Sequence, residues 1–345
     1  MNTSTPASAR PVLAITMGDA AGVGPEIIAM TLAKPAINEM CRPLVVGDAG
    51  VMQRAAEMLK LPLKVRRVTQ ASEAAYAVGT MDVLSLDNID WDELAIGKVN
   101  AMAGKAAVEY VIKALALVQS GQAKGMVTAP LNKEAMHLAG YKQYIGHTEI
   151  LADLTKNTGE TTMLMTSGPD DGRAHNLLAV VHVTRHIPFK DIAANITVGN
   201  VLRTIEITHE GMKALKIPHP RLAVAALNPH GGEGGILGRE EIDAIAPAIH
   251  AAQAEGIDAR GPYPADSIFF RAMKGEFDAV VAMYHDQGHI AIKVYGFDAS
   301  VTVTLGLPII RTSVDHGTAF DIAWKGLANP LSMYESIKLA ATMAS

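Results

Sequence analysis

The chain has 345 residues, of which 49% are hydrophobic, and its formal net charge is −5. This length suits one large domain or two ordinary ones, and a composition rich in Gly and Ala but poor in aromatic residues is typical of a compact α/β protein. The charge gives no electrostatic basis for binding nucleic acid or an anionic membrane surface. A single cysteine, Cys41, excludes an intramolecular disulfide framework and a thiolate metal cage. No apolar stretch is long enough to span a bilayer, and residues 1–11 lack the apolar core of a signal peptide. We therefore expect a flexible N-terminal tail and a cytoplasmic protein.

Apolar runs alternate with amphipathic segments almost from end to end. Strands are predicted at residues 12–16, 43–48, 81–86, 125–130, 177–183, 221–227 and 279–285. Helices are predicted at residues 24–36, 51–60, 100–121, 132–140, 191–215 and 239–256. Nearly continuous apolar strands are expected where helices cover both faces of a parallel sheet, so the fold class is α/β. No Pro/Gly/Ser-rich linker divides the chain, so two domains would have to be interwoven.

Three of the predicted strands lead to histidines: His186, His230 and His285. Ligands of open α/β sheets bind outside the carboxyl ends of the strands, so these imidazoles could converge on one point. Neutral imidazole suits zinc, cobalt, nickel or iron(II), and three protein donors leave a position open for substrate or water. The alternative is that histidines are simply common in polar loops. Repetition of the pattern favours a metal site.

Glycine-rich segments at residues 17–26 and 228–238 each precede a predicted helix. Each could let the backbone approach a ligand closely, or could be only a tight turn. His147 and Thr148 lie at another predicted helix start, where free N–H groups and a hydroxyl could hold phosphate, although Thr148 could simply cap the helix. Lys293 and Arg311 lie in apolar neighbourhoods, where each cation requires an anionic partner, either a structural carboxylate or a substrate.

Several motifs together resemble the 4-hydroxythreonine-4-phosphate dehydrogenase family. The matching segments follow one another over nearly the whole chain: GDAAGVGPE, TAPLNKEA, GHTEILA, NPHGGEGG, YHDQG and LGLPIIRTSVDHGTAFDIA. The segment at 315–330 also looks like the adenosine-binding loop of isocitrate and isopropylmalate dehydrogenases. The resemblance implies two interwoven α/β/α domains of that dehydrogenase type with a cleft between them. One would comprise residues 12–128 plus 300–345 and carry the cofactor loop, and the other, residues 129–299, would carry the metal histidines and the dimer interface.

The same resemblance implies a homodimer that uses NAD and a divalent metal, with the active site at the interface. Zinc is the metal we expect, with cobalt, magnesium or manganese as alternatives. Family positions for the metal fall on His186, His230 and His285, and those for the small phosphorylated substrate on His147, Thr148, Lys293, Thr302 and Arg311. Cofactor contacts fall on His316, Gly317, Thr318, Ala319, Asp321 and Asn329.

Two positions depart from the family pattern, since Thr302 replaces a usual asparagine and Ala20 a usual proline. A side branch of the family, which oxidises D-threonate or D-erythronate 4-phosphate, has the same YHDQGH and DHGTAFDIAW character. These substrates carry a hydroxyl where 4-phosphohydroxy-L-threonine carries an amino group. The sequence therefore favours this branch.

The expected reaction is oxidation of a secondary alcohol β to a carboxylate, followed by decarboxylation of the resulting 3-keto acid. Lys293 and Asp286 are the candidate catalytic residues; Asp286 could orient His285 or transfer a proton, or could be an exposed turn residue. Asp321 could accept the ribose hydroxyls and so favour NAD over NADP, or could merely begin a helix. A zinc hydrolase and a non-catalytic phosphometabolite-binding protein remain alternative functions.

Overall fold

The computed structural model describes residues 10–157, 161–167 and 177–345, so most of the predicted N-terminal tail lies outside the described residues. The chain divides into two compact units: unit 1 comprises residues 1–158 and 307–345, and unit 2 comprises residues 159–306. This is the discontinuous order expected for interwoven domains, with boundaries that differ from 128/129 and 299/300. The difference arises because the helical segment 133–155, which had been placed in the second domain, packs within unit 1.

Unit 1 contains an all-parallel sheet with the strand order β3–β4–β2–β1–β5–β12. Its strands are β1 (Val12–Thr16), β2 (Arg42–Gly47), β3 (Lys64–Val68), β4 (Thr80–Ser85), β5 (Gly125–Thr128) and β12 (Arg311–Val314). The central strand β1 is buried along its whole length, as expected for a strand covered on both faces.

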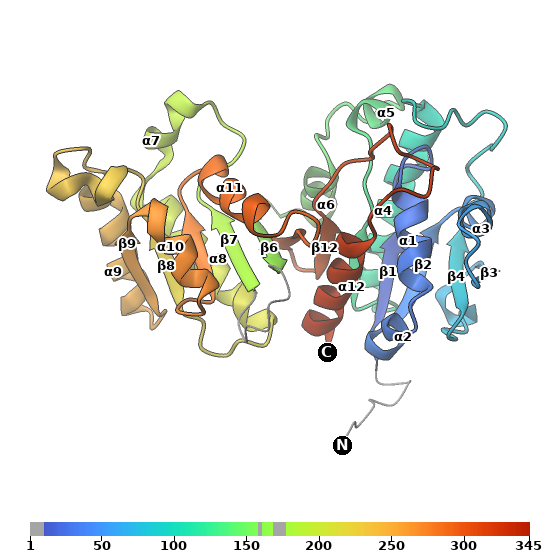
Figure 1. Cartoon of the computed structure of the whole chain (residues 1–345), viewed down its shortest axis with the longest axis horizontal. Coiled ribbons are helices and arrows are strands. Elements are labelled where there is room, and N and C mark those ends of the chain that lie inside the picture. Colours follow the sequence, from blue (N-terminus) through green and yellow to red (C-terminus); the bar gives the residue numbers. More distant parts are fainter. Residues whose placement is uncertain (1–9, 158–160, 168–176) are drawn as a thin grey trace, which may run out of the picture. The chain divides into compact units, whose positions relative to one another are not determined.

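Helices cover both faces of the unit 1 sheet (Figure 1). They are α1 (Gly24–Leu32), α2 (Ala36–Met40), α3 (Ala49–Met58), α4 (Ala101–Gln119), α5 (Lys133–Leu138), α6 (His147–Thr155) and α12 (Leu331–Ala344). Helix α12 packs on β12, β5 and β1 and contacts α1, which in turn contacts α3. Helix α4 packs on β1, β2 and β5, and it also carries α5. The apolar side chains of these elements form one continuous core.

Unit 2 contains a mixed sheet with the strand order β11–β6–β7–β10–β8–β9. Its strands are β6 (Thr161–Ser167), β7 (Leu177–His182), β8 (Leu222–Ala225), β9 (Ala259–Tyr263), β10 (Ala279–Ala282) and β11 (Val301–Leu305). Strand β6 runs antiparallel to both of its neighbours, whereas β7, β10, β8 and β9 run parallel. The loops after these four strands therefore leave the sheet at the same edge.

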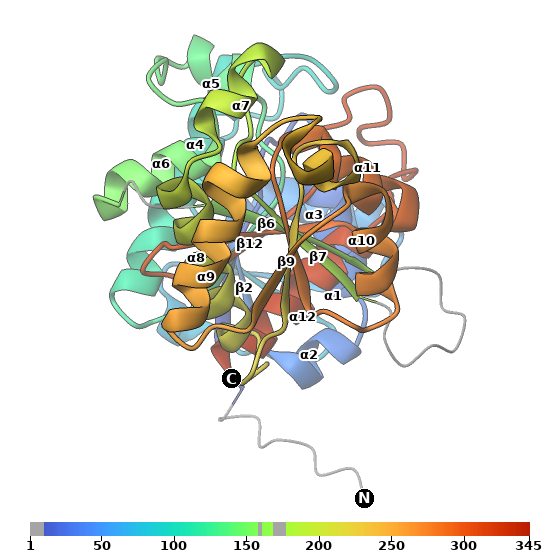
Figure 2. The same cartoon turned by 90° about the vertical axis from the view of Figure 1, so that its left-hand side faces the viewer.

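The helices of unit 2 are α7 (Ile192–Asn195), α8 (Val198–Ala214), α9 (Ala246–Ala254), α10 (Ala265–Met273) and α11 (His285–Gly296). A 3₁₀ turn (Phe189–Asp191) precedes α7, and a π-helical turn (Glu241–Ile245) leads into α9. Figure 2 shows α8 and α9 on one side of the strands and α10 and α11 on the other. Ile268 and Phe269 of α10 and Ile292 of α11 join the strand side chains in a core of this unit.

The α/β prediction is confirmed, but five strands were not predicted: β3, β6, β9, β11 and β12. Two of them have a common physical character. Strand β3, with the sequence KVRRV, and strand β9, with the sequence ARGPY, lie at the edges of their sheets. Edge strands tolerate charge and proline because one side of the ladder has no neighbour, so they lack the apolar pattern of central strands. The predicted helix at 191–215 is wrong in one respect, since it breaks before Thr197, whose hydroxyl caps α8 by accepting from Asn200 N.

Among the described residues, no helix is both long enough and apolar enough to cross a membrane.

The contact between α4 and α5 depends on Gly104. A Cβ at this position would lie 2.2 Å from the backbone carbon of Ala135, so α5 could not keep its place. We expect Gly104→Ala to destabilise unit 1 by about 1–3 kcal/mol, the usual cost of overpacking, and to lower the thermal unfolding temperature. Gly199→Ala in α8 is the matched control, because a Cβ there meets no atom within 4 Å; it should leave stability unchanged or raise it slightly. Equal unfolding temperatures for Gly104→Ala and the wild type would contradict this view of the contact.

Candidate functional site

The three histidines predicted to bind metal follow three neighbouring parallel strands of unit 2. His186 follows β7, His285 follows β10, and His230 follows β8. Strand β10 pairs with β7 on one side and with β8 on the other, all in the same direction. The expected placement beyond strand carboxyl ends is therefore correct, and all three loops emerge at one edge of the sheet.

His186 and His285 are close to each other, with ring centroids 5.8 Å apart. His285 is the first residue of α11, and its Nδ1 contacts Asp286 Oδ1 at 2.6 Å. A carboxylate on one ring nitrogen orients a histidine and leaves the other nitrogen for a metal. His285 Nε2 is therefore the ring nitrogen left for a ligand. Asp286 is exposed, but it contacts His285 and is more than a turn residue.

His230 lies in a loop with unusual backbone geometry. Residues 230–234 all have positive φ values, between 46° and 78°. The buried Glu241 carboxylate fixes the start of this loop by accepting from Leu227 N and Asn228 N, each at 2.8 Å. The glycine-rich segment is therefore a tight turn whose start is fixed by the Glu241 carboxylate. Within the described ranges, no three His, Cys, Asp or Glu side chains are arranged to hold a metal ion, so the joint role of His186, His230 and His285 stays a prediction.

Two further histidines, His182 and His289, lie beside His285 and were not predicted as site residues. The His289 ring is stacked on His285 with centroids 3.6 Å apart, and the His182 ring is 4.8 Å from His289. Burial, and then the charges of His289 and His285, lower the pKa of His182 well below its usual range. His182 therefore stays neutral near pH 7. The signal for His289 was present in the YHDQGH segment, whereas His182 reads as part of an apolar strand.

In unit 1, Arg311 is buried at the start of β12. Its guanidinium donates to Thr128 Oγ1 at the end of β5, from Nε at 3.2 Å and from Nη2 at 2.6 Å. Burial lowers the pKa of Arg311 to about 10, and the nearby charge of Glu149 partly offsets this effect. The group thus remains a cation at neutral pH, held in a fixed orientation by a neutral hydroxyl. Such a cation is suited to binding an anion.

His147 and Thr148 begin α6, as predicted. The N-cap is Gly146, and no side-chain cap bond is made there, so the interpretation of Thr148 as an ordinary cap is wrong. His147 Nε2 is excluded from solvent without a hydrogen-bond partner. Burial, and then the charge of Arg311, lower the pKa of His147 well below its usual range. His147 is therefore a neutral imidazole whose Nε2 makes no hydrogen bond with the described residues.

The remaining predicted substrate residues belong to unit 2. Lys293 lies in the last turn of α11, half-buried, with Nζ 4.8 Å from the centre of the Phe297 ring. Thr302 is half-buried in β11, opposite Leu164 of β6. The structure thus places His147, Thr148 and Arg311 in one unit and Lys293 and Thr302 in the other.

The predicted cofactor residues all lie on the loop between β12 and α12: His316, Gly317, Thr318, Ala319, Asp321 and Asn329. This loop is fixed to the glycine-rich segment after β1. Val23 N donates to Thr318 O at 3.0 Å, and the fully buried Glu26 carboxylate accepts from Trp324 N at 2.5 Å and Gly326 N at 2.8 Å. The two motifs that are 300 residues apart thus form one rigid assembly.

Individual cofactor positions differ in their surroundings. Thr318 is buried, whereas His316, Gly317 and Asp321 are exposed. Asp321 lies in a turn, and the next helix begins at Leu331, so its alternative role at a helix N-terminus is wrong. The Asn329 side chain accepts from Leu331 N at 3.0 Å, which gives it a structural role at the start of α12.

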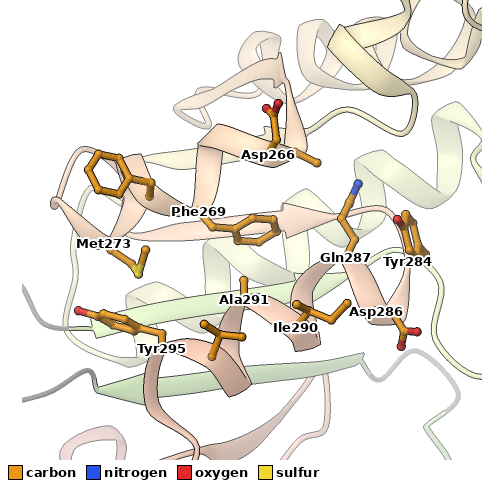
Figure 3. Close-up of a pocket in the computed structure, with 12 residues that line it drawn as sticks. Asp266, Phe269, Met273, Tyr284, Asp286, Gln287, Ile290, Ala291 and Tyr295 are labelled. Carbon is orange, nitrogen blue, oxygen red and sulfur yellow. The ribbon is translucent and has the colours of Figure 1, made fainter.

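A mostly apolar groove lies between α10 and α11 in unit 2. Figure 3 shows Phe269 and Met273 of α10 facing Ile290 and Ala291 of α11. Gln287, at one end, is engaged internally, since it accepts from Met283 N and donates to Ala226 O. Asp286 is the only predicted site residue in the lining. The groove thus adjoins the histidine loop, and its other ionisable side chains are Asp266, Tyr284 and Tyr295.

Comparison with known proteins identifies the family. The model of the pyridoxal phosphate biosynthetic protein PdxA family matches residues 39–340. A relative from Desulforapulum autotrophicum, named 4-hydroxythreonine-4-phosphate dehydrogenase, is 46% identical over 97% of this chain and 96% of its own. The chain belongs to the PdxA family.

Two other PdxA relatives extend the comparison. One from Cupriavidus necator, named D-threonate 4-phosphate dehydrogenase, is also 46% identical, over 97% of this chain and 98% of its own. A crystal structure of a 4-hydroxythreonine-4-phosphate dehydrogenase from Burkholderia phymatum is 47% identical, with a TM-score of 0.83 over 97% of this chain and 98% of that chain. The resemblance seen in the sequence motifs is confirmed over nearly the full length.

Asp19 of the first PdxA motif is completely buried after β1. Its Oδ1 accepts from Ala21 N at 2.8 Å, while its Oδ2 has no hydrogen-bond partner. Burial raises the pKa of this carboxyl from 3.8 to about 6, and the bond from Ala21 offsets only part of the effect. The folded chain therefore retains a proton that the unfolded chain releases between about pH 4 and 6, so this group makes the fold less stable as the pH rises through that window.

We expect Asp19→Asn, which keeps the acceptor for Ala21 N, to remove this contribution. The free energy of unfolding of the wild type should fall relative to that of the variant by up to about 3 kcal/mol between pH 4 and 6. Urea unfolding of both proteins at several pH values measures the difference, in which the titration of other groups cancels. Parallel pH profiles for the two proteins would show that Asp19 does not titrate in this range.

Proposed function

We propose that this chain is a dehydrogenase that uses NAD and a divalent metal to oxidise a 4-phosphorylated 3-hydroxy acid, whose 3-keto product decarboxylates. The observation that carries the proposal is the pair of relatives at 46% identity, named for dehydrogenation of 4-hydroxythreonine 4-phosphate and of D-threonate 4-phosphate, each matched over nearly its whole length. We propose D-threonate or D-erythronate 4-phosphate as the substrate, ahead of 4-phosphohydroxy-L-threonine, and a homodimer with the active site at the interface as the working form.

His186, His230 and His285 are the proposed metal ligands, in the neutral state that metal binding requires. A divalent ion held by these residues, zinc in our proposal, would supply Lewis-acid stabilisation of the substrate alcohol and product carbonyl oxygen, and bound NAD⁺ would supply the hydride acceptor. Asp286 would hold the His285 ring through Nδ1, which supports the choice of Nε2 as donor.

Arg311 and Lys293 are proposed to bind the anionic ends of the substrate, with His147 and Thr148 assisting. Support comes from the fixed orientation of the buried Arg311 guanidinium and from the free nitrogen of the neutral His147. Two cations suit a substrate that carries both a carboxylate and a phosphate. Lys293, an amine on a flexible side chain, is in addition the proposed proton-transferring residue.

The direct test is a spectrophotometric assay of NADH production by the purified chain, loaded with zinc, on the three phosphorylated substrates. NADH formation with any of them, together with release of carbon dioxide, supports the proposal. A chain that binds zinc and hydrolyses a phosphorylated substrate without reducing NAD⁺ would instead be a zinc hydrolase. Binding of all three substrates with no turnover would point to a phosphometabolite-binding protein.

Thr302 leads to a specificity prediction. A site matched to a hydroxyl at C2 should reject an ammonium there, because the cation would lose its hydration without gaining an anionic partner. We expect kcat/KM for the two hydroxy acids to exceed that for 4-phosphohydroxy-L-threonine by about tenfold to a few hundredfold, the equivalent of about 1–3 kcal/mol. Thr302→Asn should narrow the ratio, and Thr342→Asn, in the exposed end of α12, should not. A wild-type preference for 4-phosphohydroxy-L-threonine would overturn the substrate choice.

Asp321 gives a second prediction, on the choice of cofactor. An exposed carboxylate that accepts the ribose hydroxyls would repel the 2′-phosphate of NADP. Two unit charges about 4 Å apart in water repel by about 1 kcal/mol, so Asp321→Ala should reduce the preference for NAD in kcat/KM by roughly fivefold to tenfold. Asp298→Ala, which removes an exposed carboxylate from unit 2, is the control. If the ratio is the same in Asp321→Ala and the control, Asp321 does not contact the ribose.

A further inference from the structure

The proposed metal ligand His285 belongs to a group of three neighbouring histidine rings. His289 is almost parallel to His285, with centroids 3.6 Å apart and 12° between the ring planes. His182, at the end of β7, lies 4.8 Å from His289, tilted by 35°, and 6.3 Å from His285. His285 and His289 are one helical turn apart on α11, which places their side chains over each other. These three rings therefore connect the first turns of α11 to β7.

A hydrogen bond fixes the orientation of His289. Its Nδ1 is 3.0 Å from the backbone oxygen of His285. Because a carbonyl only accepts, Nδ1 must carry the proton, which sets the tautomer of the ring. The His289 ring is thus held both by its face, against His285, and by its edge, against the helix backbone.

Histidine is an unusual residue for the buried position 182 beside His289. It is 2% exposed, and its Nε2 has no hydrogen-bond partner. Leucine would fill the same space without leaving a buried polar atom unsatisfied. Gly288 makes room for the ring, because a Cβ there would lie 2.3 Å from His182 Nε2. The ring lies beside His289, with 4.8 Å between the centroids, where it limits the space open to that ring.

We propose that His289 is a positioning residue for His285, and that His182 is the wall that keeps His289 in place. This inference rests on the proposed function, since it takes His285 as a metal ligand. Asp286 holds the Nδ1 edge of His285 and His289 covers one face, so the ring presents its Nε2 edge in a fixed direction. A ligand held ready in this way loses little freedom when metal binds, and affinity rises accordingly.

The test is titration of the metal-free full-length chain with Co²⁺, followed by its visible absorption spectrum, with Zn²⁺ competition to obtain affinities. His289→Leu retains bulk but removes the aromatic face and the hydrogen bond, and it should weaken metal binding by about 10–100-fold. His289→Phe restores the face without any nitrogen and should recover most of the affinity. His250→Ala, an exposed histidine of α9 in the same unit, is the control and should bind like the wild type. Thermal unfolding of the metal-free proteins separates these effects from general destabilisation.

Three results would overturn the proposal. Wild-type affinity in His289→Leu would show that His289 does not position His285. Equal losses in His289→Leu and His289→Phe would show that the ring face is not what acts, and would leave His289 as a metal donor. If the wild-type chain binds no metal, both the metal-dependent function and this inference are refuted. If the wild type binds metal and His289→Leu binds it equally well, only the inference is refuted.

Discussion

The common direction of β7, β10 and β8 is the constraint on which the candidate metal site depends. Parallel strands deliver their following loops to the same edge of a sheet, and the three histidines come from segments about 45–100 residues apart in sequence. If β10 ran the other way, His285 would emerge at the opposite edge. The order of the strands matters equally, because β10 lies between its two partners and brings His285 next to His186.

Buried carboxylates hold the loops that surround these strand ends. Glu26 accepts two backbone N–H groups from the loop before α12, and Glu241 accepts two from the loop before His230. Backbone N–H groups in irregular segments otherwise lack partners, and a buried anion both satisfies them and fixes the path of the chain. The two units thus use the same device for their functional loops. Asp19 is the exception, since one of its oxygens remains unsatisfied and its pKa is raised.

Imidazole has a different role in each unit. In unit 1, His147 is kept neutral by burial near the Arg311 cation, so the pair offers one positive charge and one uncharged nitrogen. In unit 2, His182, His289 and His285 lie together, and His285 has the Asp286 carboxylate on its Nδ1. The pair in unit 1 suits an anion, and the histidines of unit 2 suit a cation. A phosphorylated acid that is oxidised beside a metal would need both.

The sequence alone determined the family, the α/β class, the seven strands predicted from apolar runs and the positions of the three strand-end histidines, because apolar runs and short polar motifs are local features. The apolar pattern did not predict charged edge strands such as β3, because their stability comes from pairing with a neighbouring strand. Only the tertiary structure decided that β7, β10 and β8 are adjacent, that Thr128 orients Arg311 and that Glu26 fixes the loop before α12. His182 shows the reason most clearly: within an apolar strand it looks like core, and its role depends on Gly288 and His289, which lie more than 100 residues away. Contacts between distant segments are set by how strands are ordered, and no local pattern encodes that order.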